Sequence, residues 1–164
     1  MTPAQGDLDT RLQTLVDEAD IRRLVTDYAA LVDARQWDDL VEIFAHDVKV
    51  DYHNGRTVVE GARATVDYII KNTGHLAWQH HFVSVYGIDV DGDTATAQAY
   101  LISHQMLSED PTQVLMMAAS YDLGFRRADR WRMSSMVHTI RVANYLPITT
   151  SPPSGAYTPP AVSH

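Results

Sequence analysis

YAALVDARQWDDLVEIFAHDVKVDYH (residues 28–53) contains the end of one helical pattern, a short second one and a strand pattern in immediate succession. Upstream, apolar residues recur about every 3.6 positions, which predicts an amphipathic helix that ends near Ala34, just after Asp33. Helical spacing restarts over Gln36–Phe44, and Val48–Tyr52 alternates as a half-buried strand does. The apolar positions of the first helix are Leu12, Leu15, Val16, Ala19, Leu24, Val25, Tyr28, Leu31 and Val32.

The remainder of the chain changes from helical to strand patterns. Asn54-Gly55 predicts a hairpin turn after the first strand, and Gly61–Asn72 has the apolar spacing of a third helix. Long alternating segments follow, separated by turn residues: His75–Val90, Thr94–Leu107, Thr112–Arg127 and Trp131–Tyr145. Helices followed by a meander of antiparallel strands form an α+β layout, in which we expect a curled sheet to wrap the helices.

The length of 164 residues and the hydrophobic content of 45% are those of one globular domain. We expect that domain to span residues 1–146, with residues 1–10 as a mobile lead-in. Residues 147–164 hold five of the seven prolines, and a proline-rich segment cannot be a central strand. They are predicted to be a flexible tail or a lid over the site.

Charge and composition exclude several classes of partner. A formal net charge of −8 argues against nucleic acid, because phosphate backbones are bound by clustered Lys and Arg. No apolar run approaches the ~20 residues of a membrane span. The absence of cysteine excludes disulfides and thiolate metal sites, and the first ten residues lack a secretory pattern. A cytoplasmic location is the resulting expectation.

Several strands carry polar residues among apolar neighbours. Adjacent strand residues point to opposite faces, so one of His80 and His81 faces the helices. If the strands pair in chain order, His81, His104 and Ser120 lie on neighbouring strands. Taken singly, a core histidine, or an aspartate at a helix end, is usually a packing or capping residue. Several buried unpaired polar groups would each cost ~1–3 kcal/mol, so together they favour a wet pocket, with Asp33 orienting His81.

The segments VDARQWDDL, KVDYH, QHHFV and AYLISHQML resemble, in this order, scytalone dehydratase and the wider SnoaL-like branch of the nuclear-transport-factor-2-like superfamily. The resemblance covers about residues 10–145. It implies a cone-shaped α+β barrel, in which three N-terminal helices pack in a curved mixed sheet around a cavity.

The resemblance also implies a set of site residues. The catalytic set is Asp33, His81, Tyr52 and His104, joined by Tyr28, whose spacing to Asp33 is similar to that of bile acid dehydratases. Ser120 matches a pocket serine, and Asp122 stands where the fungal family has asparagine. Together with these two, the residues expected to contact the substrate are Trp78, Met106 and Phe44. Val32 stands where the fungal family has tyrosine, which argues against the fungal substrate itself.

The implied reaction is the elimination of water from a small, largely apolar hydroxy-carbonyl compound, with no metal or organic cofactor. His81, oriented by Asp33, would remove the α-proton, and Tyr52 or Tyr28 would polarise the carbonyl. The leaving hydroxide would receive its proton either back from His81 or from His104. The same groups suit an isomerase or a polyketide-type cyclase, and the fold also serves as a non-catalytic binding module. His81, His104 and Asp33 further match a two-histidine, one-carboxylate metal site by count. The resemblance favours a homo-oligomer, a trimer or a dimer.

Overall fold

The structure of the chain, a computed structural model, describes residues 3–52 and 54–148. The helices are α1 (Pro3–Ala34), α2 (Trp37–Ile43) and α3 (Ala62–Thr73). The strands are β1 (Phe44–Tyr52), β2 (Thr57–Glu60), β3 (Leu76–Asp91), β4 (Thr94–Leu107), β5 (Gln113–Arg127) and β6 (Trp131–Pro147). Element order and type therefore agree with the sequence patterns.

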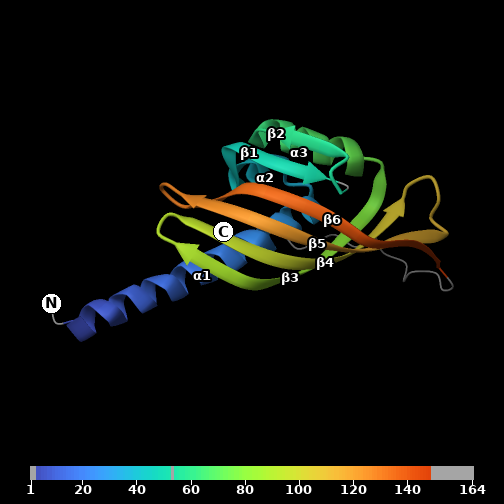
Figure 1. Cartoon of the computed structure of the whole chain (residues 1–164). Helices are drawn as coiled ribbons and strands as arrows, with labels where there is room; N and C mark the ends of the chain where they lie inside the picture. Colours follow the sequence, from blue (N-terminus) through green and yellow to red (C-terminus); the bar gives the residue numbers. More distant parts are fainter. Residues whose placement is uncertain (1–2, 53, 149–164) are drawn as a thin grey trace.

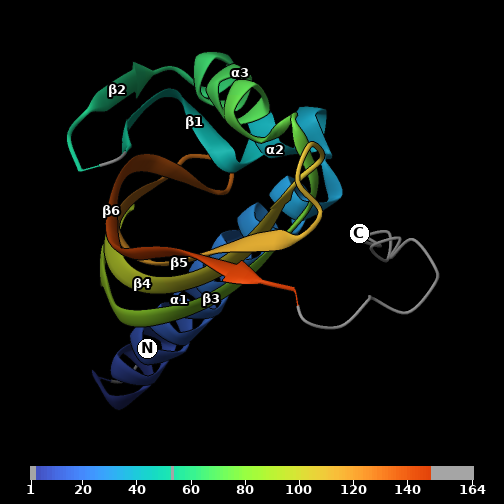
Figure 2. The same ribbon diagram turned by 90° about the vertical axis from the view of Figure 1, so that its right-hand side faces the viewer.

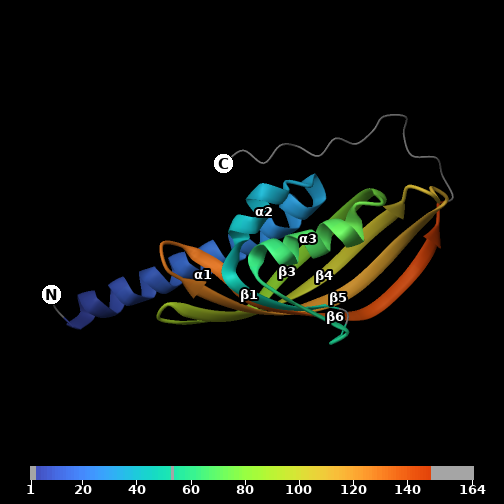
Figure 3. The ribbon, with the colours of Figure 1, turned by 90° about the horizontal axis from the view of Figure 1, so that it is seen from above.

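The strands form one six-stranded sheet in the order β2-β1-β6-β5-β4-β3. From β3 to β6 the strands pair antiparallel in chain order, as predicted, whereas β1 pairs parallel to β6 and makes the sheet mixed. The helices lie over one face of the sheet (Figure 3), and the strands bend around that face (Figure 2). The predicted α+β fold, helices packed in a curved mixed sheet, is confirmed. We call the helix side of the sheet the inner face and the opposite side the outer face.

α1 is longer at its start than the sequence predicts. Residues 3–10, expected to be a lead-in, are helical, and Figure 1 shows this end of α1 extending past the sheet. Leu12, Leu15 and Val16 were expected in the buried stripe, yet they are 51%, 62% and 53% exposed. Helical periodicity identifies the apolar face of a helix, but it does not say where the packing partner of that face ends.

The core lies between the inner face of the sheet and the helices. On α1 it begins at Ile21 and Val25, which are fully buried. β1 contributes Val48 and Val50, and the other strands add residues such as Phe125. Burying each such side chain stabilises the fold by roughly 1.5–3 kcal/mol. α1 thus rests on the sheet with its second half, which contains Tyr28 and Asp33.

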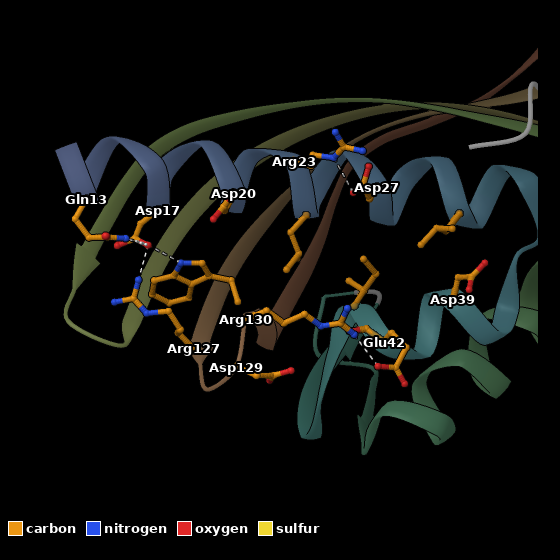
Figure 4. A pocket seen from close by; sticks show the side chains of 14 residues that line it. Gln13, Asp17, Asp20, Arg23, Asp27, Asp39, Glu42, Arg127, Asp129 and Arg130 are labelled. Atoms are coloured by element: carbon orange, nitrogen blue, oxygen red, sulfur yellow. Dashed lines mark hydrogen bonds and ion pairs between the residues drawn. The ribbon is translucent and has the colours of Figure 1, made fainter. Parts of the chain in front are cut away.

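Asp17 fixes the middle of α1 to the hairpin between β5 and β6. Its Oδ1 accepts hydrogen bonds from Trp131 Nε1 at 3.1 Å and Gln13 Nε2 at 3.1 Å, and it pairs with the Arg127 guanidinium (Figure 4). Burial opposes ionisation of this carboxyl, but the hydrogen bonds from Trp131, Gln13 and Arg127 hold the pKa of Asp17 below its usual value. The anchor sets how α1 lies along the sheet.

The end of β6 also differs from the expectation. β6 continues through Pro147, which pairs with Gln113, and the Ile148 amide donates to the Thr112 carbonyl at 2.8 Å. The predicted tail therefore begins with residues that still belong to the sheet edge. Residues 149–164, the rest of the predicted tail or lid, lie outside the described residues. Among the residues that the structure does describe, no helix is long and apolar enough to cross a membrane.

Candidate active site

The last turn of α1 is built to place Asp33 against β3. The amide of Arg35 donates to the Val32 carbonyl at 3.2 Å, and that of Gln36 donates to Leu31 at 3.0 Å. This pair of bonds is the Schellman arrangement, and it requires the left-handed φ of 57° found at Arg35. A residue other than glycine pays about 1–2 kcal/mol for that conformation. The Arg35 guanidinium in turn donates to the Leu76 carbonyl at 2.5 Å, which joins the strained residue to β3.

Asp33 and His81 form a hydrogen-bonded pair across this junction. His81 Nδ1 lies 2.5 Å from Asp33 Oδ1, and the His81 backbone amide donates to Asp33 Oδ2 at 2.8 Å. Both oxygens of the Asp33 carboxylate are therefore engaged by His81. Gln79, which is on the same strand as His81, donates from Nε2 to the Val32 carbonyl of α1 at 2.7 Å. A carboxylate that accepts the Nδ1 proton leaves Nε2 as the basic nitrogen of the ring.

Buried tyrosines from different elements meet beside this pair. Tyr28 of α1, Tyr52 of β1 and Tyr121 of β5 are each less than 10% exposed. Burial raises the pKa of Tyr28 to about 12, although hydrogen bonding with Tyr121 and Tyr52 opposes that rise. Burial likewise holds the pKa values of Tyr52 and Tyr121 well above the usual value. All these phenols are therefore protonated at neutral pH and can donate hydrogen bonds.

A cavity of about 280 Å³ contains the tyrosines and His81. Apolar side chains make up much of its wall: Val32, Ile69, Leu76, Leu101, Leu107, Leu115 and Met117. Asn72, His75 and Tyr145, which are all exposed, lie at its rim. An apolar enclosure with a few convergent polar groups is the usual form of a small-molecule site.

Several residues expected at the site lie instead on the outer face: His104, Ser120, Asp122, Trp78 and Met106. From Trp78 to Tyr86 of β3, and along the whole β4–β5 pairing, each cross-strand pair joins two odd or two even residues, so His81 pairs with Ser103. His104 pairs with His80, and their rings stack with centroids 6.2 Å apart. Because a strand alternates its faces, these even-numbered residues point away from the cavity.

Each of these outer-face residues has a different setting from the one expected. Asp122 accepts a hydrogen bond from Gln98 at 3.0 Å, and Trp78, which is 39% exposed, pairs with Met106. Phe44 is on the inner side but is 2% exposed and packs edge-on against Tyr28, with centroids 5.9 Å apart. It supports Tyr28 and does not line the cavity.

The metal-site alternative fails on the same geometry. His104 lies on the other face of the sheet from His81 and Asp33, so these three do not converge. Over residues 3–52 and 54–148, no group of three or more histidine, aspartate or glutamate side chains is placed to hold a metal ion.

Two buried polar residues of the cavity, Tyr121 and His138, were not predicted from the sequence. His138 of β6 is 7% exposed, and its ring lies 5.1 Å from that of Tyr121 and 6.1 Å from that of Tyr52. The sequence did contain a signal for His138, because this residue alternates with Met136 and Ile140 and so falls on the apolar, inner side of its strand.

A larger hollow, of about 800 Å³, lies between α1 and the β5–β6 hairpin. Figure 4 shows that its charged side chains contact one another: Arg23 pairs with Asp27, and Arg130 with Glu42. Asp17, its buried carboxylate, is bonded through Oδ1 to Trp131 and Arg127. These contacts join elements of the fold, so we place the site in the smaller cavity.

Comparison with known sequences identifies the family. The profile of the SnoaL-like domain matches residues 13–137, and the chain therefore belongs to the SnoaL-like family. An uncharacterized protein of Mycobacterium tuberculosis (strain H37Rv) is 29% identical over 125 residues, which make up 75% of this chain and 84% of that protein. An uncharacterized protein of Mycobacterium bovis matches with the same figures. The expected membership of the SnoaL-like family is confirmed.

Solved structures agree with this assignment of the fold. A protein of Novosphingobium aromaticivorans assigned as a scytalone dehydratase superposes with a TM-score of 0.74 at 16% identity, covering 88% of this chain and 97% of that one. A hexachlorocyclohexane dehydrochlorinase of Novosphingobium barchaimii gives a TM-score of 0.76 at 23% identity, covering 87% and 99%. At such identities the likeness concerns the fold.

Proposed function

We propose that this protein is a hydro-lyase, a dehydratase that needs no cofactor and acts on a small, largely apolar hydroxy-carbonyl compound. The observation that carries the proposal is the hydrogen-bonded Asp33–His81 pair at an apolar cavity of about 280 Å³ that also holds the Tyr28 and Tyr52 side chains. A base, its orienting carboxylate and phenol donors are the groups that enolate chemistry requires.

In this proposal each side chain has one task. Asp33 holds the Nδ1 proton of His81, so His81 Nε2 removes the proton next to the substrate carbonyl. The negative charge that develops on the carbonyl oxygen is stabilised by a tyrosine hydroxyl, from Tyr28 or Tyr52. Their raised pKa values keep both phenols protonated and so able to donate. The apolar wall strengthens these interactions because it excludes water.

The names of the structural neighbours support elimination over other enolate reactions. One is assigned as a dehydratase and the other is a dehydrochlorinase, and both names describe the removal of a small molecule from a substrate. An isomerase or cyclase would begin with the same proton abstraction, so only the product distinguishes these reactions. A binding module without catalysis would not need Asp33 and His81 as a pair.

The test is a product analysis. The purified full chain is incubated with the β-hydroxy ketones 4-hydroxy-4-phenylbutan-2-one and 3-hydroxy-1-tetralone, and products are identified by mass and by enone or naphthol absorbance. We expect loss of water in the wild type and at least a ~10²-fold lower rate in Asp33→Asn. A product with the same mass as the substrate would mean that the protein is an isomerase and not a dehydratase. No conversion of either ketone would contradict the proposal.

We further propose that the protein is a homo-oligomer that associates through the outer face of β3–β6. Large side chains at outward positions there are 39–62% exposed, among them Phe82, Tyr100 and Ile102. A stretch of about nine residues on each of these four strands, polar positions included, presents roughly 600 Å² in projection. That is somewhat less than the ~800 Å² that one partner of a standard interface buries, and it equals the upper end of the range for the largest apolar patch on a monomer. The full apolar set is Trp78, Phe82, Tyr86, Tyr100, Ile102, Val137, Val142 and Leu146.

Charge favours a second copy of this chain as the occupant. The chain carries a net charge of −8, so two copies repel unless the surfaces that meet are nearly neutral. Between the exposed apolar residues, Gln98 is neutral and its amide donates to the carboxylate of Asp122 at 3.0 Å. A charged partner would leave this face without complementary contacts.

Size-exclusion chromatography with light scattering, which measures the molar mass of the protein in solution, tests the interface. We expect a dimer or trimer in the wild type and a monomer in Phe82→Glu and Ile102→Glu. Leu15→Glu is the matched control, since it changes a leucine of α1 that is 62% exposed and outside this face. A monomeric wild type, or an oligomer that only Leu15→Glu dissociates, would rule out the outer face.

A further inference from the structure

We infer that His138 is a second acid–base residue of the cavity, the group that protonates the departing hydroxyl. This inference rests on the proposed dehydratase function and adds the residue that completes it. Elimination of water needs two proton transfers, one from the α-carbon and one to the leaving oxygen, because hydroxide is a poor leaving group. Asp33 and His81 supply the first transfer, and a separate acid on another wall of the cavity lets the second transfer occur without His81 having to reach both atoms.

His138 and His81 reach the cavity from different strands. β6 and β3 are separated in the sheet by β5 and β4, so the two rings belong to different walls. Both nevertheless line the same space of about 280 Å³, which corresponds to a sphere ~8 Å across, smaller than most ligand pockets. A molecule that fills this space contacts both imidazoles. The base and the acid can therefore act on neighbouring atoms of one substrate without bonding to each other.

The backbone around His138 is held rigidly by Asn54. Asp51 pairs with Val137, and beyond that point β1 turns away into its hairpin with β2. Asn54 then supplies the hydrogen bonds that β1 no longer makes to β6. Its backbone amide donates to the His138 carbonyl at 3.3 Å, and its side-chain Oδ1 accepts from the Ile140 backbone amide at 2.7 Å. A catalytic side chain needs a backbone fixed in this way.

The neighbours of His138 suit the same task. Its ring lies between those of Tyr52, at 6.1 Å and nearly perpendicular, and Tyr121, at 5.1 Å. Tyr52 is one of the two proposed carbonyl donors, so the acid stands beside the end of the cavity where the enolate forms. His104, which the sequence assigned to this step, lies on the outer face and cannot reach the cavity.

The step balances without another reactant. His81 Nε2 takes the α-proton, and the C–H electron pair becomes the enolate double bond, with the charge on the carbonyl oxygen. The enolate then re-forms the carbonyl, its electron pair makes the Cα=Cβ bond, and the Cβ–O bond breaks. The leaving oxygen takes a proton from the His138 imidazolium and departs as water. Exchange with solvent returns a proton to His138 and removes one from His81.

A comparison of leaving groups tests this role. The wild type, His138→Gln and His81→Gln are assayed with 4-hydroxy-4-phenylbutan-2-one and 4-acetoxy-4-phenylbutan-2-one, which give the same enone. Acetate leaves without a proton, so we expect His138→Gln to lower kcat by ~10²–10³-fold on the alcohol and by less than ~10-fold on the acetate. His81→Gln should lower both to a similar extent, because each substrate loses the same α-proton.

Each other outcome has a defined meaning. Equal losses of His138→Gln on the two substrates would show a packing role and overturn the inference. A wild type active on the acetate but not on the alcohol would also overturn it, since no acid would then be acting. A wild type inactive on both would remove the dehydratase proposal and this inference together. Should His138→Gln fold poorly, His138→Ala with added imidazole replaces it, and the alcohol activity must be restored.

Discussion

His81 donates both its ring Nδ1–H and its backbone amide to the carboxylate of Asp33, at 2.5 Å and 2.8 Å. A carboxylate in the last turn of a helix is disfavoured by ~0.3–1 kcal/mol, because the helix dipole places partial negative charge there. The neighbouring Arg35 adds the cost of a left-handed backbone. Local physics thus opposes this arrangement, and its contacts with β3 offset the cost. Sites with such local costs are often functional.

The first prediction concerns that pair. Asp33→Asn and His81→Ala should each lower turnover of a β-hydroxy ketone by ~10²–10⁴-fold, because one removes the orienting acceptor and the other the base. The double variant should be little worse than the poorer single one. Exchange of the α-protons of 4-phenylbutan-2-one into D₂O, followed by NMR, should fall in parallel, since it requires the same proton abstraction but no leaving group. Losses that multiply in the double variant would mean that the two residues act independently.

The second prediction concerns the tyrosines. Replacing the donor to the carbonyl, Tyr28 or Tyr52, by Phe should cost ~10–10³-fold in turnover, since a single oxyanion donor is lost while the aromatic packing stays. Tyr86→Phe is the matched control, because Tyr86 is 46% exposed on the outer face and should behave as wild type. Normal turnover in both Tyr28→Phe and Tyr52→Phe would remove the tyrosines from the mechanism.

The fold and the Asp33–His81 pair could be predicted because they depend on features written along the chain. Helical spacing up to Val32, alternation in the strands and turn residues such as Asn54-Gly55 each have a local physical cause. The pairing of Asp33 with His81 followed from the cost of leaving buried polar groups unpaired, and the resemblance pointed to the same two residues. The exposure of Leu12 could not be predicted in this way, since it depends on where the sheet ends.

The error over His104 has a different cause, the register of the sheet. Chain-order pairing predicts that the strands of His81 and His104 are neighbours, and they are. Whether the two residues share a face depends on the pairing offset, and a shift by one residue exchanges the faces. The observed register pairs His81 with Ser103, so the partner of the cavity histidine is a serine. For His138 the alternation along its own strand was enough to place it, because that argument needs no register.

The third prediction follows from that register. His104→Gln should leave turnover within ~3-fold of wild type, because its ring stacks on His80 on the outer face. His138→Gln, assayed in parallel on the same β-hydroxy ketone, should be strongly impaired. A large loss in His104→Gln with a normal oligomeric state would mean that the histidine reaches the substrate by a route absent from this structure.

The fourth prediction concerns stability in alkali. Burial raises the pKa of Tyr28 to about 12, from the value near 10 of an exposed tyrosine. A group with a raised folded-state pKa contributes stability that is complete below its unfolded pKa and is lost as the pH rises through the folded value. Between pH ~10 and ~12 the wild type should therefore lose about 1–3 kcal/mol more unfolding free energy than Tyr28→Phe. Urea unfolding across that range measures it, and parallel curves for the two proteins would contradict the buried, protonated phenol.

The last prediction concerns Asp17, which fixes α1 far from the cavity. Its carboxylate is 3% exposed and is bonded to Trp131, Gln13 and Arg127, so Asp17→Asn should cost about 2–4 kcal/mol at pH 7. Those bonds hold the pKa of Asp17 in the folded protein below 3.8, its value in the unfolded chain. The ionised carboxylate therefore contributes its full stability above pH ~3.8, and this stability is lost as the pH falls through the folded-state pKa. The stability gap between wild type and Asp17→Asn should thus be constant at neutral pH and close in acid. Asp20→Asn, which changes an exposed carboxylate of the same helix outside this set of bonds, is the control and should lie within ~0.5 kcal/mol of wild type. A gap that persists unchanged below the pKa of the carboxyl would assign the loss to packing of the amide and not to the charge of Asp17.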